Sequence, residues 1–135
     1  MTKVMIIDDD RTTVSLLETL LEMDGFEVVS EARKEKIIPG IRSAAPDVIL
    51  MDVFLAESDG MVVLADLRSS PDLAHLRVVM SSGMDLEEQC LAAGANAFLL
   101  KPYSPDQLTK VINENLGADG GGPADSAPNQ EQSTS

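Results

Sequence analysis

Three aspartates stand at the ends of two short apolar segments in the first half of the chain. Asp8 and Asp9 follow the apolar residues 4–7, and Asp52 follows the apolar residues 48–51. If both segments are parallel strands, their carboxyl ends meet at one edge of a sheet and the three carboxylates lie close together. Such carboxylates repel one another, so they indicate a bound cation or a reaction that uses them.

Two further polar residues follow apolar segments in the second half of the chain. Ser82 follows residues 77–81, and Lys101 follows residues 97–100. Carboxylate oxygens are ligands that Mg²⁺ prefers, and an aspartate can act as the nucleophile in phosphoryl transfer. A lysine ammonium neutralises phosphoryl oxygens, and a serine hydroxyl can donate a hydrogen bond to one of them. Together these residue types predict a magnesium and phosphoryl site.

Alternating apolar and amphipathic segments must position these residues. The segments predicted as strands are residues 3–7, 27–30, 48–51, 77–81 and 97–100. The segments with helical spacing of apolar residues are 12–23, 60–68, 85–93 and 106–116. This alternation predicts an α/β fold, with a five-stranded parallel sheet and helices on both faces. The low aromatic content, 3%, suits strands built from Val, Ile, Leu and Met.

The stretch of residues 34–45 is where a further helix should lie, but it contains Pro39 and Gly40. A proline inside a helix removes one hydrogen bond and clashes with the preceding turn. We therefore expect this helix to start late, with Pro39 in its first turn and residues 34–38 as an irregular loop.

Length and composition limit the class of protein. The chain has 135 residues, of which 44% are hydrophobic, as expected for one globular domain. Ten basic against 23 acidic residues give a net charge of -13, which disfavours direct nucleic-acid binding. The single Cys90 forms no internal disulfide, and no apolar run is long enough for a membrane span. No basic stretch with an apolar signal segment opens the chain, so we expect a cytoplasmic protein.

The last residues differ in composition from the rest. Residues 117–135 are rich in Gly, Pro and Ser and offer almost nothing to bury. Such a segment cannot compensate the entropy lost on ordering. We predict a folded domain over residues 1–116 and a flexible tail over residues 117–135.

Each of these residues also has a plainer interpretation. Asp8, Asp9 and Asp10 could be a solvated acidic turn that caps the following helix, and we expect Asp10 to be such a cap or a solvated charge. Lys101 and Ser82 could be ordinary residues of turns. The lone His75 is assigned no role, and Cys90 is expected to be a small buried hydrophobic residue.

Several ordered motifs resemble those of the receiver domain of two-component response regulators. They are VMIIDDD at residues 4–10, PDVILMD at 46–52, DG at 59–60, VVMSSG at 78–83 and GANAFLLKP at 94–102. The resemblance extends over roughly residues 2–116. It implies a flavodoxin-like (βα)5 fold with strand order 2-1-3-4-5 and a protein that regulates rather than an enzyme.

The resemblance also implies roles for individual residues. Asp52 would be the phosphoacceptor and Lys101 the invariant lysine of the site. Ser82 and Phe98 would be the switch hydroxyl and the switch aromatic residue. Mg²⁺ would be held by Asp8, Asp9, Asp52 and the backbone carbonyl of Phe54. The peptide bond before Pro102 would be cis.

Some residues depart from the family pattern. Ala56 stands where a proline is usual, and Phe54 and Met84 are apolar where many members carry polar residues. Because these two positions flank the phosphorylation pocket, we expect them to hinder an attacking water and to lengthen the life of the phosphoryl group.

The resemblance implies partners as well. They are a sensor histidine kinase or a histidine phosphotransfer protein as donor, and a downstream protein target. Residues 85–116 would supply the partner surface and a phosphorylation-dependent dimer interface. Alternatives are a degenerate receiver that acts only through protein contacts, and the receiver part of a longer regulator. A haloacid-dehalogenase-type phosphatase would need a second Asp at position 54, which is Phe54.

Overall fold

Five short apolar segments pair side by side as parallel strands in the computed structural model, which describes residues 1–117. The strands are β1 Lys3–Ile7, β2 Glu27–Glu31, β3 Val48–Asp52, β4 Arg77–Ser82 and β5 Ala97–Leu100. Their order in the sheet is β2-β1-β3-β4-β5, and every neighbouring pair is parallel. The predicted fold class and strand order are confirmed.

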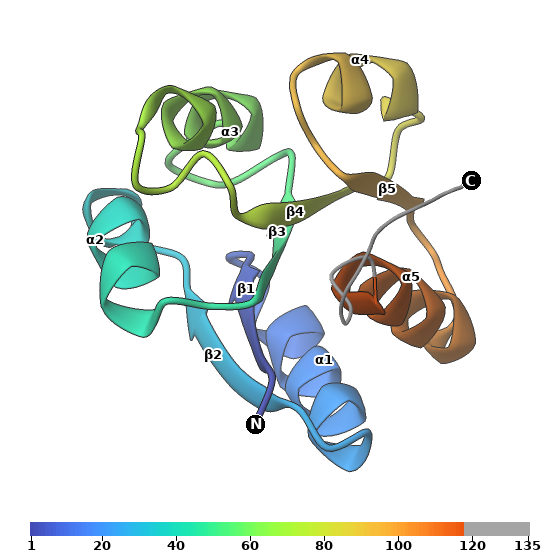
Figure 1. Ribbon diagram of the computed structural model, residues 1–135. Helices are drawn as coiled ribbons and strands as arrows, with labels where there is room; N and C mark the ends of the chain where they lie inside the picture. Colours follow the sequence, from blue (N-terminus) through green and yellow to red (C-terminus); the bar gives the residue numbers. More distant parts are fainter. Residues whose placement is uncertain (118–135) are drawn as a thin grey trace.

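Five helices cover the two faces of this sheet. They are α1 Arg11–Met23, α2 Lys34–Ala44, α3 Gly60–Ser69, α4 Glu87–Ala92 and α5 Pro105–Gly117. Figure 1 shows α1 and α5 on one side of the strands and α2, α3 and α4 on the other. The central strands β1, β3 and β4 therefore have helices on both faces, which explains why they are mostly apolar.

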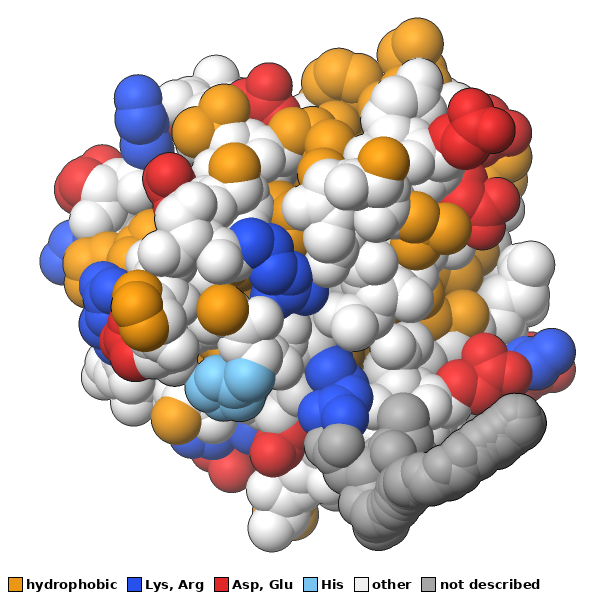
Figure 2. Space-filling view, turned by 45° about the horizontal axis from the view of Figure 1, so that its top comes forward, with side chains coloured by type: hydrophobic (Ala, Val, Ile, Leu, Met, Phe, Trp, Pro, Cys, Tyr) orange, Lys and Arg blue, Asp and Glu red, His pale blue; other side chains and the backbone are white. Residues whose placement is uncertain are grey.

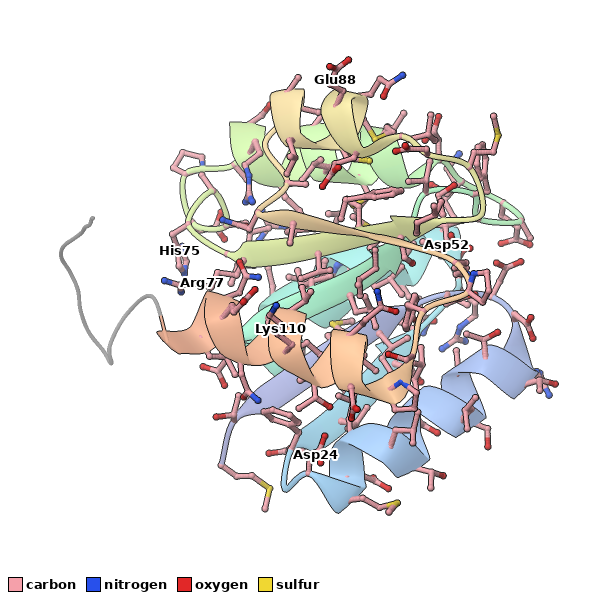
Figure 3. All side chains as sticks on the ribbon, turned by 90° about the vertical axis from the view of Figure 1, so that its right-hand side faces the viewer. Asp24, Asp52, His75, Arg77, Glu88 and Lys110 are labelled. Carbon is pink, nitrogen blue, oxygen red and sulfur yellow. The ribbon has the colours of Figure 1, made fainter. Side chains whose placement is uncertain are left out.

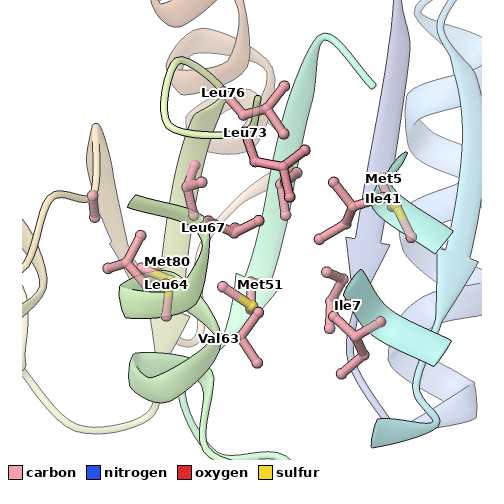
Figure 4. Close-up of a cluster of buried hydrophobic side chains, with 14 of the residues drawn as sticks. Met5, Ile7, Ile41, Met51, Val63, Leu64, Leu67, Leu73, Leu76 and Met80 are labelled. Carbon is pink, nitrogen blue, oxygen red and sulfur yellow. The ribbon is translucent and has the colours of Figure 1, made fainter. Parts of the chain in front are cut away.

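Two hydrophobic cores lie on the two sides of the sheet. The core under α2, α3 and α4 contains Met51 and Met80 from the strands and Leu64 and Leu67 from α3. Figure 4 shows these side chains meeting between the helices and the sheet. The second core joins Leu21 of α1 and the side chains of α5 to β1, β3 and β4. Aliphatic residues and methionine fill both cores, as the composition predicted.

Helix α1 begins and ends where local sequence signals predict. The Asp10 carboxylate accepts hydrogen bonds from the backbone N–H groups of Thr12 and Thr13, at 3.0 and 3.3 Å. These two bonds satisfy donors that the first turn of a helix leaves without partners. At the other end Gly25 has φ +91°, a conformation that favours glycine just after a helix. Asp10 is therefore a helix cap, as predicted.

The expectation for the second helix is wrong. Helix α2 starts at Lys34, so Pro39 lies inside it and residues 34–38 are not an irregular loop. An interior proline costs about 3 kcal/mol. Burying an isoleucine stabilises by about 1.5–3 kcal/mol, and both Ile37 and Ile41 are buried against the sheet. Burial of two side chains offsets the proline, so tertiary packing overrides local preference here.

Helix α4 is shorter than predicted. It starts at Glu87 rather than Asp85, because the Asp85 carboxylate accepts a hydrogen bond from the Glu87 backbone N–H at 3.3 Å. Such a bond stabilises a turn that competes with helix. Cys90 is the buried residue of this helix, as predicted.

Gly60 is the first residue of α3 and lies against the end of β3. A Cβ atom on Gly60 would overlap the backbone oxygen of Asp52. We expect Gly60→Ala to lower the free energy of unfolding by about 1–3 kcal/mol, because the backbone must move to make room. Urea unfolding measures this. Gly83→Ala is the control, since a Cβ there meets nothing within 4 Å, and it should change stability by less than about 0.5 kcal/mol. Equal effects of the two variants would contradict the prediction.

The predicted flexible tail lies outside the described residues except for Gly117, which is the last residue of α5. Within residues 1–117 no helix has the length and hydropathy needed to cross a membrane. On the face shown in Figure 2, basic side chains are scattered among acidic and hydrophobic ones.

Candidate functional site

The pairing of the strands brings the predicted site residues to one edge of the sheet. Ile7 pairs with Met51, so the residues that follow them, Asp8 and Asp52, lie at the same end of two neighbouring strands. Asp52 pairs with Ser81, and Ser82 pairs with Leu100, which precedes Lys101. Figure 3 shows Asp52 at this carboxyl edge, opposite the edge where His75 and Arg77 lie.

The acidic residues form one cluster around a lysine. Carboxylate oxygens of Asp8, Asp9 and Asp52 lie within 4.8 Å of one another. The Lys101 Nζ atom lies 3.5 Å from Asp8 Oδ2 and 3.4 Å from Asp52 Oδ2. One cation therefore faces three anions, and the cluster retains an excess of negative charge.

The three carboxylates of the cluster differ in how far they are buried. Asp8 is buried, Asp52 is half-buried and Asp9 is exposed. Burial raises the pKa of Asp52, and the charge of Asp8 adds to this effect, while Lys101 opposes it. Asp8 also accepts a hydrogen bond from the backbone N–H of Asp10 at 2.9 Å, which fixes its orientation. A second cation would relieve the repulsion that remains.

The cluster fits Mg²⁺ by its donor chemistry. All three groups offer hard oxygen atoms, they converge from two strand ends, and at least one side remains open to water because Asp9 is exposed. Magnesium binds one or two carboxylates and keeps several waters, which agrees with such an open arrangement. The fold thus brings together the three carboxylates of the expected ligand set.

Ser82 is the last residue of β4, and Phe98 lies on β5 three residues before Lys101. The Ser82 side chain is fully buried, and its Oγ accepts a hydrogen bond from the Met84 backbone N–H at 3.0 Å. This bond links the hydroxyl to the start of the loop before α4. Phe98 is half-buried against the core under α2, α3 and α4. The hydroxyl is therefore engaged with the loop whose movement the resemblance implies.

Two exposed apolar side chains lie in the loops that follow Asp52 and Ser82. Phe54 follows β3 and pairs with Asp59 in an isolated antiparallel bridge, which closes the loop between them. Met84 lies in the loop after β4. Phe54 is 56% exposed and Met84 is 60% exposed, although both are hydrophobic.

Tyr103 is a nearby residue that the sequence did not single out. It follows Lys101 by two residues, beyond a cis peptide bond between Lys101 and Pro102, which is the isomer expected. Burial raises the pKa of Tyr103 to about 12, and the charges of Asp8 and Asp52 contribute. The only feature of the sequence that could have pointed to Tyr103 as a neighbour of the site is its position two residues after Lys101.

The raised pKa of Tyr103 predicts a pH-dependent loss of stability. In the unfolded chain a tyrosine titrates near pH 10, so the contribution is complete below pH 10 and is lost as pH rises toward 12. The loss approaches about 2.7 kcal/mol by linkage. Urea unfolding at pH 8 and pH 11 measures it, with Tyr103→Phe as the reference that lacks the phenol. Parallel pH profiles of the two proteins would contradict the prediction.

A groove beside the cluster lies between α1 and α5. Its volume is about 490 Å³, and apolar side chains such as Leu16, Leu20 and Leu108 line it together with Tyr103. Lys101 lines it as well, so the groove adjoins the acidic cluster. Leu16 is 59% exposed, so this apolar surface is open to the solvent.

Comparison with known proteins gives a consistent result. Over 118 residues the chain is 29% identical to the chemotaxis protein CheY of Bacillus subtilis (strain 168), covering 84% of this chain and 97% of that protein. It is 31% identical over 121 residues to the polar-differentiation response regulator DivK of Brucella ovis, covering 87% and 98%. By contrast, it spans only 46% of the transcriptional regulatory protein PhoP of Bacillus subtilis, at 26% identity and 82% coverage of this chain.

Solved structures agree with the sequence comparisons. The BeF3-activated N-terminal receiver domain of Klebsiella pneumoniae RstA superimposes with a TM-score of 0.78 at 26% identity, covering 85% of this chain and 98% of that one. A chain from Chloroflexus aurantiacus J-10-fl gives a TM-score of 0.80 at 30% identity, covering 86% and 98%. The family described as the response regulator receiver domain matches residues 4–113. This chain therefore belongs to the family of response regulator receiver domains of two-component signalling.

Proposed function

We propose that this receiver domain accepts a phosphoryl group on Asp52 from a phosphohistidine of a sensor histidine kinase or a histidine phosphotransfer protein. The single observation that supports this most is the position of Lys101 Nζ, between Asp8 and Asp52 at 3.5 and 3.4 Å. A lysine held against a half-buried carboxylate at an acidic cluster suits phosphoryl transfer better than a purely structural contact. We expect this transfer to take place in the cytoplasm.

The proposed reaction makes one bond and breaks one bond. An oxygen of the Asp52 carboxylate forms a bond to phosphorus while the bond between phosphorus and the donor nitrogen breaks, and the donor histidine leaves neutral after taking up a proton. Lys101 neutralises charge on the phosphoryl oxygens as the transfer proceeds. Bound Mg²⁺, held by Asp8, Asp9, Asp52 and the carbonyl of Phe54, would neutralise the remaining charge on those oxygens.

The proposed output is a conformational switch. The Ser82 Oγ, which accepts a hydrogen bond from the Met84 backbone N–H, would turn to donate its hydroxyl hydrogen to a phosphoryl oxygen, and the loop before α4 would move with it. Phe98 would change its position beside that loop. Phosphorylation then shifts the population between two conformations, because the phosphoryl group stabilises one of them preferentially. A downstream protein, or a second copy through α4, β5 and α5, would recognise the shifted state.

The groove between α1 and α5 supports the proposed donor contact. It is apolar and open, and it adjoins Lys101 at the acidic cluster. A partner that seats an apolar helix there would bring its phosphohistidine close to Asp52. Leu16→Asp would weaken such a contact without touching the carboxylates.

Acetyl phosphate with Mg²⁺, followed by intact mass measurement, tests the proposed function. The wild-type chain should gain the mass of one phosphoryl group, and Asp52→Asn should gain none. A wild-type chain that never gains this mass would favour the alternative of a degenerate receiver that acts only through protein contacts. The complete acidic cluster with its lysine argues against that alternative.

The apolar side chains in the loops after Asp52 and Ser82 predict slow loss of the phosphoryl group. Hydrolysis needs a positioned water, and Phe54 and Met84 offer no polar group to hold one. We expect Phe54→Asn with Met84→Glu to hydrolyse the phosphoryl group about tenfold faster, because a positioned polar group typically contributes at least that much. The decay of phosphorylated protein, followed by mass after removal of the donor, measures the rate. Val62→Asn, which makes another exposed apolar residue polar, should leave the rate unchanged. Unchanged lifetimes in the double variant would refute this expectation.

A further inference from the structure

Arg68 lies in the last turn of α3 and makes four hydrogen bonds to neutral oxygen atoms. Its Nε donates to the Gly94 carbonyl at 2.9 Å, and one terminal nitrogen donates to the carbonyls of Ala74 and Leu76 at 3.1 and 2.8 Å. The other terminal nitrogen donates to Asn96 Oδ1 at 3.0 Å. The guanidinium is half-buried and joins three separate segments of the chain. A surface arginine without such partners would be mobile in water, so the four hydrogen bonds indicate that Arg68 has a role in the fold or at the site.

Asn96 connects this arginine to the sheet. Its side-chain oxygen also accepts a hydrogen bond from the Val78 backbone N–H at 2.8 Å, and the Asn96 backbone N–H donates to the Val78 carbonyl at 2.8 Å. These two bonds extend the pairing of β4 and β5 by one residue before β5 begins. Arg68 therefore supports the point at which β5 joins its neighbour.

Strand β5 has little other support within the sheet. It is four residues long and lies at the edge of the sheet, so it pairs with β4 alone. At its carboxyl end the Lys101 backbone N–H donates to the Ser82 carbonyl at 2.8 Å. At its amino end Asn96 and Arg68 hold it. Together with the pairing to β4, these two attachments fix the position of the Lys101 backbone.

The position of Arg68 excludes a direct part in chemistry. It is bound next to the amino ends of β4 and β5, the edge at which Figure 3 shows Arg77, whereas Asp52 lies at the opposite edge. Four strand residues span about 13 Å, which is far beyond contact with a phosphoryl group. Any effect of Arg68 on the site must therefore pass along β5.

The Arg68 side chain packs tightly against the backbone of Gly94. Gly94 has φ +110°, and a Cβ atom there would come within 3.1 Å of the Arg68 side chain. The arginine thus packs directly over the backbone that connects α4 to β5. This contact and the hydrogen bonds to Gly94 and Asn96 hold the connection, while the bonds to Ala74 and Leu76 join it to the segment before β4.

We propose that Arg68 is a positioning residue for Lys101, which it places against Asp52 by fixing the amino end of β5. This inference rests on the proposed function for its effect on phosphoryl transfer, but not for its effect on β5. The ammonium must lie within a few tenths of an ångström of its place to neutralise the phosphoryl oxygens, and misplacement by about 1 Å can cost up to 10²-fold in rate.

A double-mutant cycle between Arg68 and Lys101 tests the proposal with acetyl phosphate and Mg²⁺. Arg68→Met should slow phosphorylation of Asp52 about tenfold in the wild-type background. In the Lys101→Met background it should change the rate by less than about twofold, because the residue through which it acts is already gone. A purely structural role would lower stability in both backgrounds and leave both rates unchanged. An unchanged rate in the wild-type background, or an equal reduction in both, overturns the proposal.

Two further variants make the test specific. Arg42→Met is the matched control, since it removes an arginine that pairs at 2.9 Å with the exposed Asp72 and makes no bond to the connection before β5, and it should leave the rate unchanged. Asn96→Ala breaks the same link from its other end and should reproduce Arg68→Met, which matters if the latter folds poorly.

Amide hydrogen exchange in β5 separates this proposal from the proposed function. Without any phosphoryl donor, the amides of residues 97–101 should exchange at least about tenfold faster in Arg68→Met and Asn96→Ala than in wild type and Arg42→Met. If the wild-type chain takes no phosphoryl group, the proposed function fails, while faster exchange still supports the attachment of β5 by Arg68. Unchanged exchange in both variants overturns the inference whatever the outcome of phosphorylation.

Discussion

Lys101→Met should slow the transfer of a phosphoryl group from acetyl phosphate to Asp52 by about 10²–10³-fold. Methionine keeps most of the length of the side chain but removes the ammonium that lies 3.4 Å from Asp52 Oδ2. Removing one preorganised group that stabilises charge in a transition state typically costs a factor of this size. The rate at which intact mass increases, measured with saturating Mg²⁺, gives the ratio directly.

The matched control for this variant is Lys110→Met. Lys110 is exposed on α5 and forms only a surface contact of 4.0 Å with Glu114, so its removal should leave the rate unchanged. A rate for Lys101→Met within about threefold of wild type would show that Lys101 has no part in the transfer.

Asp9→Asn should abolish most of the stabilisation that Mg²⁺ confers on the wild-type protein. Asp9 is the exposed member of the cluster, so its replacement by an isosteric amide removes a ligand charge without leaving a cavity. A ligand at 100 times its Kd stabilises a protein by about 2.7 kcal/mol, and this gain falls as the affinity falls. Without Mg²⁺ the variant should be slightly more stable than wild type, because one of three repelling carboxylates is gone.

Thermal unfolding with and without Mg²⁺, and after addition of a chelator, measures this effect. Asp66→Asn provides the control, since Asp66 is exposed on α3 and distant from the cluster in sequence, and it should respond to Mg²⁺ as wild type does. If Asp9→Asn gains as much stability from Mg²⁺ as wild type, the metal does not bind at this cluster.

Local sequence determined most of the fold. Each strand but β2 is a short, mostly apolar run that ends at or just before a polar residue. Each helix but one has its apolar residues at helical spacing, so these elements follow from neighbours in the chain. The sites of Asp8, Asp9, Asp52 and Lys101 followed from the same reasoning, because parallel strands carry their carboxyl ends to one edge. The Asp10 cap of α1 was equally local, since its partners lie within three residues.

In α2, where the prediction was wrong, burial outweighed a local preference. Pro39 disfavours the interior of a helix, yet α2 continues through it because Ile37 and Ile41 pack against the sheet. The sequence shows which residues are apolar, but only the assembled sheet shows how much of their surface is removed from water. The energy of burial belongs to the folded molecule as a whole, so no window of neighbouring residues contains it.

Taken by itself, the sequence determined the order of strands and helices, the identity of the chemical groups and the edge of the sheet at which they gather. Only the tertiary structure decided that Lys101 lies between Asp8 and Asp52, and that Tyr103 is close enough for these two charges to raise its pKa. The same holds for the hydrogen bonds of Arg68 to residues 26 and 28 positions further along the chain. The physical reason is that these contacts join segments whose approach depends on the packing of every element between them.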